Sequence, residues 1–461
     1  MKKKITVLLT AIAFSANAQE LCFEPTSYVS GSHPNQLISA DFTGDGIPDI
    51  ASTSIGEIYN QVKIAVGVGN GTFVGQQGAS FFPVQAQPLF LVPGDFNEDG
   101  VIDIATNNST GGSISILLAD GESYFEDAVH YPINSGQTYP KGLAAADFNN
   151  DEHIDLAIGG GNNKLGISLG AGDGTFGAIS YTTLATDSGI YFIASADLNN
   201  DGNQDVVTVN YLLDTISILL GNGAGGFAAP VHMTVGDTPH SVTIADIDGD
   251  DYMDLLVCNF GSNYVSVHRG IGDGTFVEPV NYPVATPKSV AVDDFNGDGI
   301  PDFVATNNGG EGSIAVFIGT GNGTFEEGVS FTSGEFFPAT AITGDFNNDG
   351  KADIITSNYN SGNDGQKNIS VFLNCTSELA GTGSFASNAF TVYPNPASEQ
   401  LQVQLPNGAT VQSATFYNTL GQVVMETGNE IVWNISALSP GLHFVTLQTS
   451  AGATQLKFIK E

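Results

Sequence analysis

The stretch Asp95-Phe-Asn-Glu-Asp-Gly-Val-Ile-Asp103 occurs seven times, with small changes, in this chain of 461 residues. Neighbouring copies lie about 50 residues apart, and the other six begin at Asp41, Asp147, Asp197, Asp246, Asp294 and Asp345. Self-similarity at such a period is typical of a repeat protein in which each repeat is one supersecondary unit. The sequence therefore predicts an array of seven similar units.

Each copy, called an Asp loop below, carries oxygen-bearing side chains at its positions 1, 3, 5 and 9. Calcium takes six to eight oxygen ligands, and this spacing allows alternate residues of a tight loop to surround one ion. Position 6 is glycine in five copies, which suits a sharp turn. We predict up to seven calcium ions, with these ligands: Asp41, Thr43, Asp45, Asp49, Asp95, Asn97, Asp99, Asp103, Asp147, Asn149, Asp151, Asp155, Asp197, Asn199, Asp201, Asp205, Asp246, Asp248, Asp250, Asp254, Asp294, Asn296, Asp298, Asp302, Asp345, Asn347, Asp349 and Asp353.

An EF-hand uses similar early ligand spacing, but it requires Glu at position 12 and flanking helices. Position 12 is Ser, Thr, Ile, Val or Ala here, and β-rich runs such as 102–106 flank the loops. A single cluster of this type is equally well read as a solvated turn, whereas seven matching copies favour metal. Three copies should bind less tightly, because Thr43 is a neutral ligand and Glu152 and Asp251 replace the glycine at position 6.

Each repeat contains four short strand-like runs. One run precedes the Asp loop (142–146 in the third copy), a second follows it (354–357 in the seventh) and a third alternating run comes next (215–220 in the fourth). A glycine phrase of the form Gly-x-Gly-x-Gly-Thr-Phe, as in 270–276, then leads to a fourth. No helix follows these glycines, so they are not phosphate loops. The pattern predicts an all-β fold in which these repeats form a seven-bladed β-propeller.

With the phrases Asp-Phe-Asn-x-Asp-Gly-x-x-Asp and Gly-x-Gly-x-Gly-Thr-Phe, residues 20–375 resemble the FG-GAP or VCBS repeat family, which includes the propeller of integrin α subunits. The resemblance implies that the acidic loops hold calcium on one face. It also implies that ligands or partners meet the opposite face.

The seventh repeat stops at residue 375 without a fourth strand, and the start of the chain supplies one. The segment 22–28 matches 276–282, which is a fourth-strand segment. The N-terminal strand should therefore complete the last blade and close the ring. Cys22 and Cys375 then fall at neighbouring strand ends, which predicts a disulfide, whereas Cys258 is expected to be a buried core residue.

The ends of the chain predict export. Residues 1–18 are typical of a signal peptide, residues 19–375 form the propeller, and residues 376–389 read as a linker. With Tyr393-Pro-Asn-Pro396, alternating strand-like runs and a terminal Lys457-Phe-Ile-Lys460, residues 390–461 resemble the C-terminal sorting domain of the type IX secretion system. That resemblance implies a small C-terminal β-sandwich, transport across the outer membrane by this machinery, and a secreted or cell-surface protein. The alternative is an ordinary accessory sandwich domain. No later segment is apolar enough to span a membrane.

The formal charge of −37 would become −40 without Lys2, Lys3 and Lys4, and the four ligand positions of the loops hold 22 Asp. Seven calcium ions would return 14 charges and leave −26. Without metal, repulsion within each loop opposes folding, so calcium binding should contribute to stability. An acidic chain with a single Arg is not expected to bind nucleic acid.

Turns on the face away from the loops carry aromatic residues that are candidates for ligand contacts, and these are Tyr59, Tyr139, Tyr191, Tyr211, Phe260, Tyr264, Phe337 and Tyr359. Packing between blades explains them equally well. Asn residues recur 13 positions after the start of five loops, at Asn108, Asn210, Asn259, Asn307 and Asn358. For this second set we favour turn capping over ligand binding.

We expect a calcium-binding, non-catalytic binding or adhesion module for a glycan or a protein, with no catalytic residues and no organic cofactor. The alternative is a polysaccharide-active enzyme, either a lyase or a hydrolase, and a third option is a carrier within a surface complex. A lyase acting on uronates needs cations and a Tyr or His base. One Arg, few Lys and seven His spread along the chain argue against it.

Overall fold

The computed structural model describes residues 21–28, 34–55, 60–74, 81–121, 125–133, 139–160, 163–184, 189–309, 311–359, 369–376, 391–405, 410–418, 423–449 and 452–460. All regular secondary structure within these residues is β-strand, as predicted. The described residues contain no helix that could cross a membrane. The chain forms two compact units, Leu21–Cys375 and a second that contains Thr376–Glu461. The predicted signal peptide, and the predicted linker beyond Thr376, lie outside the described residues.

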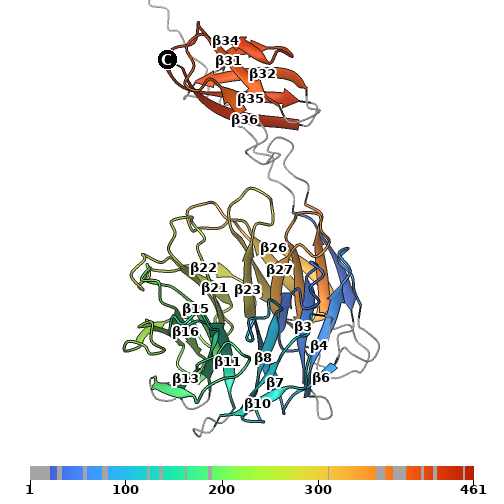
Figure 1. Cartoon of the computed structure of the whole chain (residues 1–461), viewed down its shortest axis with the longest axis vertical. Helices are drawn as coiled ribbons and strands as arrows, with labels where there is room; N and C mark the ends of the chain where they lie inside the picture. Colours follow the sequence, from blue (N-terminus) through green and yellow to red (C-terminus); the bar gives the residue numbers. More distant parts are fainter. Residues whose placement is uncertain are drawn as a thin grey trace, which may run out of the picture. The chain divides into compact units, whose positions relative to one another are not determined.

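The first unit consists of seven antiparallel sheets (Figure 1). Six of them have four strands and one has five, and in all but one the strands follow one another in the chain. The first strands are β2 (Leu37–Ala40), β7 (Pro88–Gly94), β11 (Lys141–Ala146), β15 (Ile190–Ala196), β19 (Pro239–Ala245), β23 (Pro287–Asp293) and β27 (Pro338–Gly344). The second strands are β3 (Asp49–Ile55), β8 (Asp103–Asn108), β12 (Asp155–Gly159), β16 (Asp205–Asn210), β20 (Asp254–Asn259), β24 (Asp302–Asn307) and β28 (Asp353–Asn358). In each blade, the second strand thus begins at position 9 of the Asp loop.

The outer half of each sheet completes the blade. The third strands are β4 (Asn60–Gly67), β9 (Ser113–Leu117), β13 (Lys164–Ser168), β17 (Thr215–Leu219), β21 (Tyr264–His268), β25 (Glu311–Phe317) and β29 (Ile369–Asn374). The fourth strands are β6 (Phe81–Pro83), β10 (Val129–Pro132), β14 (Ser180–Thr183), β18 (Val231–Thr234), β22 (Val280–Pro283), β26 (Val329–Phe336) and β1 (Phe23–Tyr28), with β5 (Phe73–Val74) as a short addition to β4.

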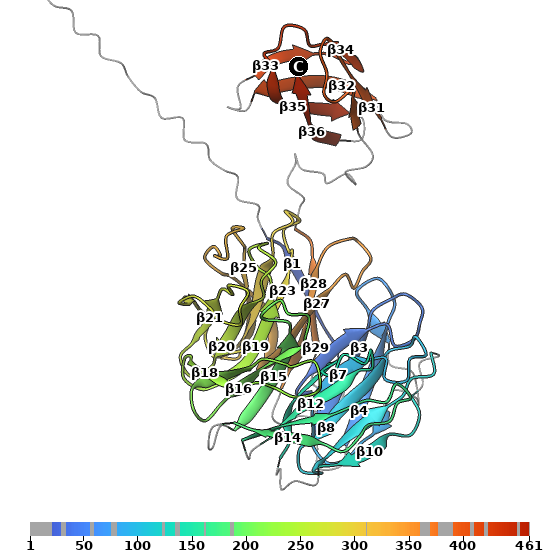
Figure 2. The ribbon, with the colours of Figure 1, turned by 60° about the vertical axis from the view of Figure 1, so that its left-hand side comes forward.

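The ring closes as the sequence predicts. Each first strand contacts the next, and β2 contacts both β7 and β27, so that the first and last blades are neighbours (Figure 2). Strand β1 pairs antiparallel with β29, and the last blade therefore takes its outer strand from the start of the chain. A disulfide joins Cys22 to Cys375, the predicted pair, with the two Cα atoms 4.9 Å apart. Cys258 is fully buried on β20.

The core of the propeller lies between the blades. Second strands such as β8, β16 and β20 are buried along their whole length, because a neighbouring blade covers each face of the sheet. Aromatic residues fill the wider outer part of these interfaces, as where Phe303 and Phe317 stack with ring centroids 4.4 Å apart. Burial of these apolar faces is the main stabilising term that holds the ring together.

The second unit contains two sheets. One has β30 (Thr391–Tyr393), β31 (Gln400–Gln404) and β34 (Val432–Asn434), and the other has β32 (Val411–Asn418), β33 (Val423–Thr427), β35 (Gly441–Thr449) and β36 (Gly452–Lys460). Side chains from both sheets share one core around Phe416, Trp433 and Phe458. The rings of Phe416 and Trp433 lie 5.3 Å apart. This arrangement is the small β-sandwich that the sequence predicts.

Candidate functional site

Each Asp loop connects the first strand of a blade to its second strand, and hydrogen bonds to its carboxylates fold it. In the second loop, Asp95 accepts hydrogen bonds from the backbone N–H groups of Asp99 (3.1 Å) and Gly100 (2.8 Å). Asp99 in turn accepts one from the N–H of Val101 at 2.9 Å. The backbone has positive φ at positions 4 and 6, with 59° at Glu98 and 87° at Gly100. The chain therefore curls around the carboxylates of positions 1 and 5.

The position 9 aspartates fix each loop to its own blade. In the fifth loop, Asp254 is fully buried and accepts hydrogen bonds from the N–H groups of Ile247 (3.0 Å) and Gly270 (2.7 Å). The same two bonds recur in the other six loops. An ionised carboxylate has about four acceptor sites, so two bonds leave capacity for a metal ion.

Burial, followed by repulsion from the carboxylates at other loop positions, raises the pKa of these position 9 aspartates. The pKa rises to about 6 in Asp254 and to about 7 in Asp302. It is raised in the remaining loops as well. A nearby cation stabilises the charged form of a carboxylate. A metal ion would therefore relieve the cost of placing several ionised groups in one loop.

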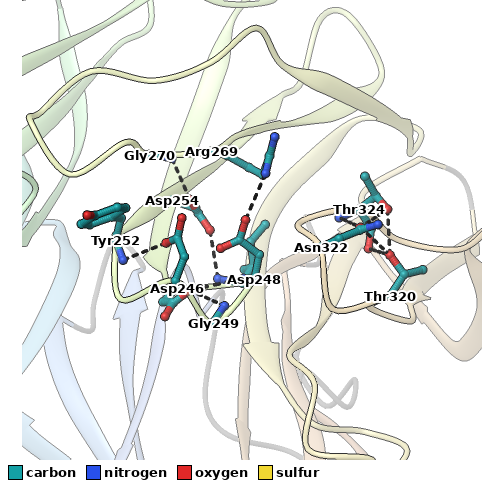
Figure 3. Close-up of polar contacts among 12 residues, drawn as sticks. Asp246, Asp248, Gly249, Tyr252, Asp254, Arg269, Gly270, Thr320, Asn322 and Thr324 are labelled. Atoms are coloured by element: carbon teal, nitrogen blue, oxygen red, sulfur yellow. Dashed lines mark hydrogen bonds and ion pairs between the residues drawn. The ribbon is translucent and has the colours of Figure 1, made fainter. Parts of the chain in front are cut away.

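The fifth loop provides the most specific indication of a cation. Asp246, Asp248 and Asp254 each place one carboxylate oxygen within 4.8 Å of the others, a grouping unique to this loop among the His, Cys, Asp and Glu residues described. The Asp248 side chain is 8 % exposed, and its Oδ1 is buried without a hydrogen-bond partner. Its Oδ2 accepts a bond from Arg269 Nη1 at 3.1 Å (Figure 3). Three converging carboxylates, one with a free buried oxygen, fit a hard cation such as Ca²⁺.

The Asp loops also contact the next blade. The third glycine of a glycine phrase donates its N–H to the carbonyl at position 2 of the loop in the preceding blade, as Gly174 does to Phe96 at 2.8 Å and Gly274 to Leu198 at 3.1 Å. Gly71 makes the equivalent bond to Phe346 across the closure of the ring. The shape of each loop therefore affects the packing of two adjacent blades.

The structure brings together three of the eight predicted ligand-face aromatics. The rings of Tyr191, Tyr211 and Phe260 surround His240, at centroid distances of 4.8, 5.5 and 4.7 Å.

Four of the other five predicted ligand-face residues lie in the part of the chain that the structure describes. Tyr139, Phe337 and Tyr359 are exposed, Tyr264 lies on the third strand β21, and Tyr59 is outside the described residues.

The cluster lies beside a cavity of about 270 Å³ on the axis of the ring, called the axial cavity below. Six of the seven first strands line it, at the ends where they begin, so it lies at the opposite end of these strands from the Asp loops. A strand of six residues spans about 20 Å. The Asp loops and the aromatic cluster therefore lie at opposite ends of the first strands.

Sequence reasoning missed His240, Lys141 and Lys288 at this end of the ring. Lys288 lines the cavity, and Lys141 Nζ lies 5.0 Å from the ring of Tyr191. A sequence signal does exist, because each of these residues stands six positions before the first Asp of its loop.

The recurring Asn residues serve the fold, as we favoured. Asn108 donates from Nδ2 to Ser113 Oγ at 3.0 Å and to Ser115 Oγ at 2.8 Å. Asn210 makes the equivalent bond to Ser217 Oγ at 2.6 Å. These side chains are fully buried between the second and third strands of a blade. The Nδ2 groups of Asn108 and Asn210 are satisfied within the blade, whereas Asn108 Oδ1 is buried without a partner among the described residues, and Asn307 of the same set is partly exposed.

Comparison with protein families identifies both units. Six overlapping segments match the model of the FG-GAP-like repeat, namely residues 41–106, 95–158, 147–208, 197–257, 252–305 and 294–356. The chain belongs to the FG-GAP-like repeat family. Residues 391–461 match the model of a secretion system C-terminal sorting domain. No curated protein sequence matches this FG-GAP-like chain.

Several solved structures are similar to this chain. The BBS1N protein in complex with ARL6DN is 11 % identical, covers 78 % of this chain and 98 % of its own, and has a TM-score of 0.54. A lectin of Agrocybe aegerita that recognises non-reducing terminal N-acetylglucosamine is 21 % identical, with 65 % and 81 % coverage and a TM-score of 0.47. Raptor of Chaetomium thermophilum is 13 % identical, with 77 % and 29 % coverage and a TM-score of 0.49. At these identities the likeness concerns the fold alone.

Proposed function

We propose that this FG-GAP-like protein is a secreted or cell-surface propeller that binds calcium in its Asp loops and acts as a non-catalytic binding or adhesion module for a glycan or a protein. The match to a secretion sorting domain supports export and handling by the type IX secretion machinery. The axial cavity with its aromatic cluster supports a binding role at the end of the ring away from the loops.

The observation that carries the calcium part of the proposal is the free buried oxygen of Asp248 next to Asp246 and Asp254. Bound calcium would supply positive charge to the clustered carboxylates. Hydrogen bonds of the chain would then fix the loop in place. The position 9 carboxylate accepts a bond from the first residue of the glycine phrase in its own blade, and the position 2 carbonyl accepts one from the next blade. A neutralised loop would therefore keep adjacent blades in register.

A polysaccharide lyase is the second candidate, because the structure gathers the groups that such chemistry needs. Lys288, His240 and Tyr191 line one cavity, with Lys141 beside it. Burial raises the pKa of Tyr191 to about 12, and burial together with the two lysines lowers the pKa of His240 to about 4. Both shifts make proton abstraction near neutral pH unfavourable, since a general base works best when its pKa is close to the working pH. We therefore prefer binding to catalysis.

An array of glycans and proteins, probed with the purified protein in calcium and again after chelation, tests the proposal. Binding that requires calcium supports it. If binding is the same after chelation, calcium has no role in ligand binding. If the protein releases unsaturated products from a bound polysaccharide, it is a lyase and not a binding module.

A further inference from the structure

Seven residues at the same place in the repeat form a ring around the start of the first strands. Each stands six positions before an Asp loop, and each is partly exposed. They are called the strand-start ring below, and they are Asn35, Leu89, Lys141, Tyr191, His240, Lys288 and Ala339. Four consecutive members, from Lys141 to Lys288, come from adjacent blades, because β11, β15, β19 and β23 contact one another in that order. The ring therefore has one cationic and aromatic side.

The charge on this side is unusual for the molecule. The chain has 12 Lys and Arg against 49 Asp and Glu, yet neither Lys141 nor Lys288 forms an ion pair with any residue that the structure describes. Their amines lie over aromatic rings instead, Lys141 Nζ at 5.0 Å from Tyr191 and Lys288 Nζ at 5.8 Å from Phe260. Burial lowers the pKa of both lysines. Two desolvated ammonium groups without a counter-ion leave room for a negatively charged ligand.

The walls of the axial cavity fit a sugar ring that carries this charge. Among the residues that the structure describes, no acidic side chain lines the cavity, although acids are four times as frequent as bases in the chain. Tyr191 and Phe90 present aromatic surface, which packs against the apolar face of a ring. Ser289 and Thr340 also line the cavity. Ser289 Oγ accepts a bond from the Ala341 N–H at 3.1 Å and keeps its own proton to donate. Thr340 Oγ1 donates to the Asn35 carbonyl at 3.0 Å and can still accept. The two hydroxyl groups therefore offer one donor and one acceptor to sugar hydroxyls.

We propose that the cationic side of the strand-start ring binds an anionic saccharide, with the carboxylate or sulfate of the sugar between Lys141 and Lys288 and a ring face against the aromatic cluster. This inference rests on the proposed function and names the class of glycan. An acidic peptide would satisfy the lysines equally well. A peptide would make less use of the aromatic rings and hydroxyl groups that line the cavity, so we favour the saccharide.

Isothermal titration of the calcium-loaded protein tests the proposal with three sugars: a hyaluronan tetrasaccharide for the carboxylate, a sulfated lactose for the sulfate, and chitotetraose as the neutral match. We expect at least one anionic sugar to bind at least tenfold more tightly than chitotetraose. Equal binding of the anionic and neutral sugars, or no binding of either anionic sugar at millimolar concentration, overturns the proposal. Tighter binding of a poly-glutamate peptide than of either anionic sugar overturns it in favour of a peptide ligand.

The double variant Lys141→Met, Lys288→Met keeps the apolar stems and removes both charges. We expect it to lose at least tenfold in affinity for the anionic sugar. Lys164→Met is the matched control, because Lys164 Nζ also lies over an aromatic ring, that of Tyr181 at 5.7 Å, but on a third strand away from the cavity. Unchanged binding by the double variant, or equal loss in the control, contradicts the proposal. The comparison of sugars on the unaltered protein remains decisive even where the variant does not fold.

The failure of this inference differs from a failure of the proposed function. The array could instead identify a neutral glycan or a protein that binds only in calcium. That result supports the binding module and refutes the proposal of an anionic saccharide. If chelation does not change ligand binding, the calcium part of the proposed function fails. The comparison of anionic with neutral sugar does not depend on that result.

Discussion

At the scale of single residues, two of the seven Asp loops have a side chain at position 6, where the backbone has positive φ. The angle is 72° at Glu152 and 67° at Asp251, against 84° at Gly202. The sequence predicts left-handed geometry for a non-glycine residue at these two positions, because both lack the glycine found in the other five loops. Positive φ at position 4 also has a sequence signal, because six of the seven loops carry Gly or Asn there and only Glu98 departs from it.

The substitution Glu152→Gly tests the cost of this geometry. A residue with a Cβ is strained there, so we expect the free energy of unfolding to rise by up to about 1 kcal/mol. The reverse change, Gly202→Ala, is the matched control, since no atom lies within 4 Å of a Cβ added at Gly202 and only the backbone is strained. It should lower the free energy by about 1 kcal/mol. Denaturant unfolding measures both, and a loss of stability in Glu152→Gly would contradict the assignment.

The ion pair between Arg269 and Asp248 makes a further prediction about the fifth loop. Arg269 is the only Arg of the chain, and it competes with a cation for one oxygen of Asp248. We expect Arg269→Leu to bind metal several-fold more tightly at this loop. Terbium luminescence excited through Tyr252 reports on the site, since this tyrosine occupies position 7 of the loop, and Tyr252→Phe should remove the signal. Unchanged terbium affinity in Arg269→Leu would show that Asp248 is not a ligand.

At the scale of the elements, the first glycine of each glycine phrase lies against the end of the Asp loop. A Cβ at Gly270 would overlap the carbonyl oxygen of Met253, and it would disturb the bond from Gly270 to Asp254. Ala119 stands at the same place in the second blade and keeps the bond to Asp103 at 2.7 Å, so the fold can make the necessary shift.

We therefore expect Gly270→Ala to fold and to lose about 2 kcal/mol of unfolding free energy. Gly177→Ala is the control, because its added Cβ meets Leu169 O at an ordinary 3.5 Å, and its effect should stay within about 0.5 kcal/mol. Thermal unfolding compares the two variants, and equal midpoints would mean that this contact does not constrain the loop.

The four-strand blade was predictable because its alternating runs and turn phrases repeat in every unit. The axial cavity was not, because it is assembled from residues of successive blades, about 50 positions apart, that differ in type, such as Asn35, Tyr191, His240 and Lys288. What these residues share is an offset of six from the Asp loop. The pair of Arg269 and Asp248 was also out of reach, since it joins the end of a third strand to a loop 21 residues earlier.

At the scale of the whole molecule, closure of the ring depends on the pairing of β1 with β29 and on the disulfide between Cys22 and Cys375. The match of 22–28 to a fourth-strand segment made this closure predictable. The disulfide spans 353 residues, and for a loop of that length chain-entropy models give a stabilisation of about 5 kcal/mol.

We expect the variant Cys22→Ser, Cys375→Ser to unfold at a lower temperature than the unaltered protein. A reducing agent should lower the unfolding temperature of the unaltered protein and leave that of the variant unchanged. An equal effect of the reducing agent on both proteins would assign its action to another group.

The central claim is that metal ions neutralise the clustered carboxylates of the Asp loops and thereby stabilise the ring. A single site at a hundred times its dissociation constant contributes about 2.7 kcal/mol, so several sites together should shift the melting temperature by about 10 °C or more. Thermal unfolding of the purified protein, recorded in excess calcium and in EDTA, measures this shift directly. We predict a markedly higher melting temperature in calcium, and the same temperature in both solutions would contradict the account.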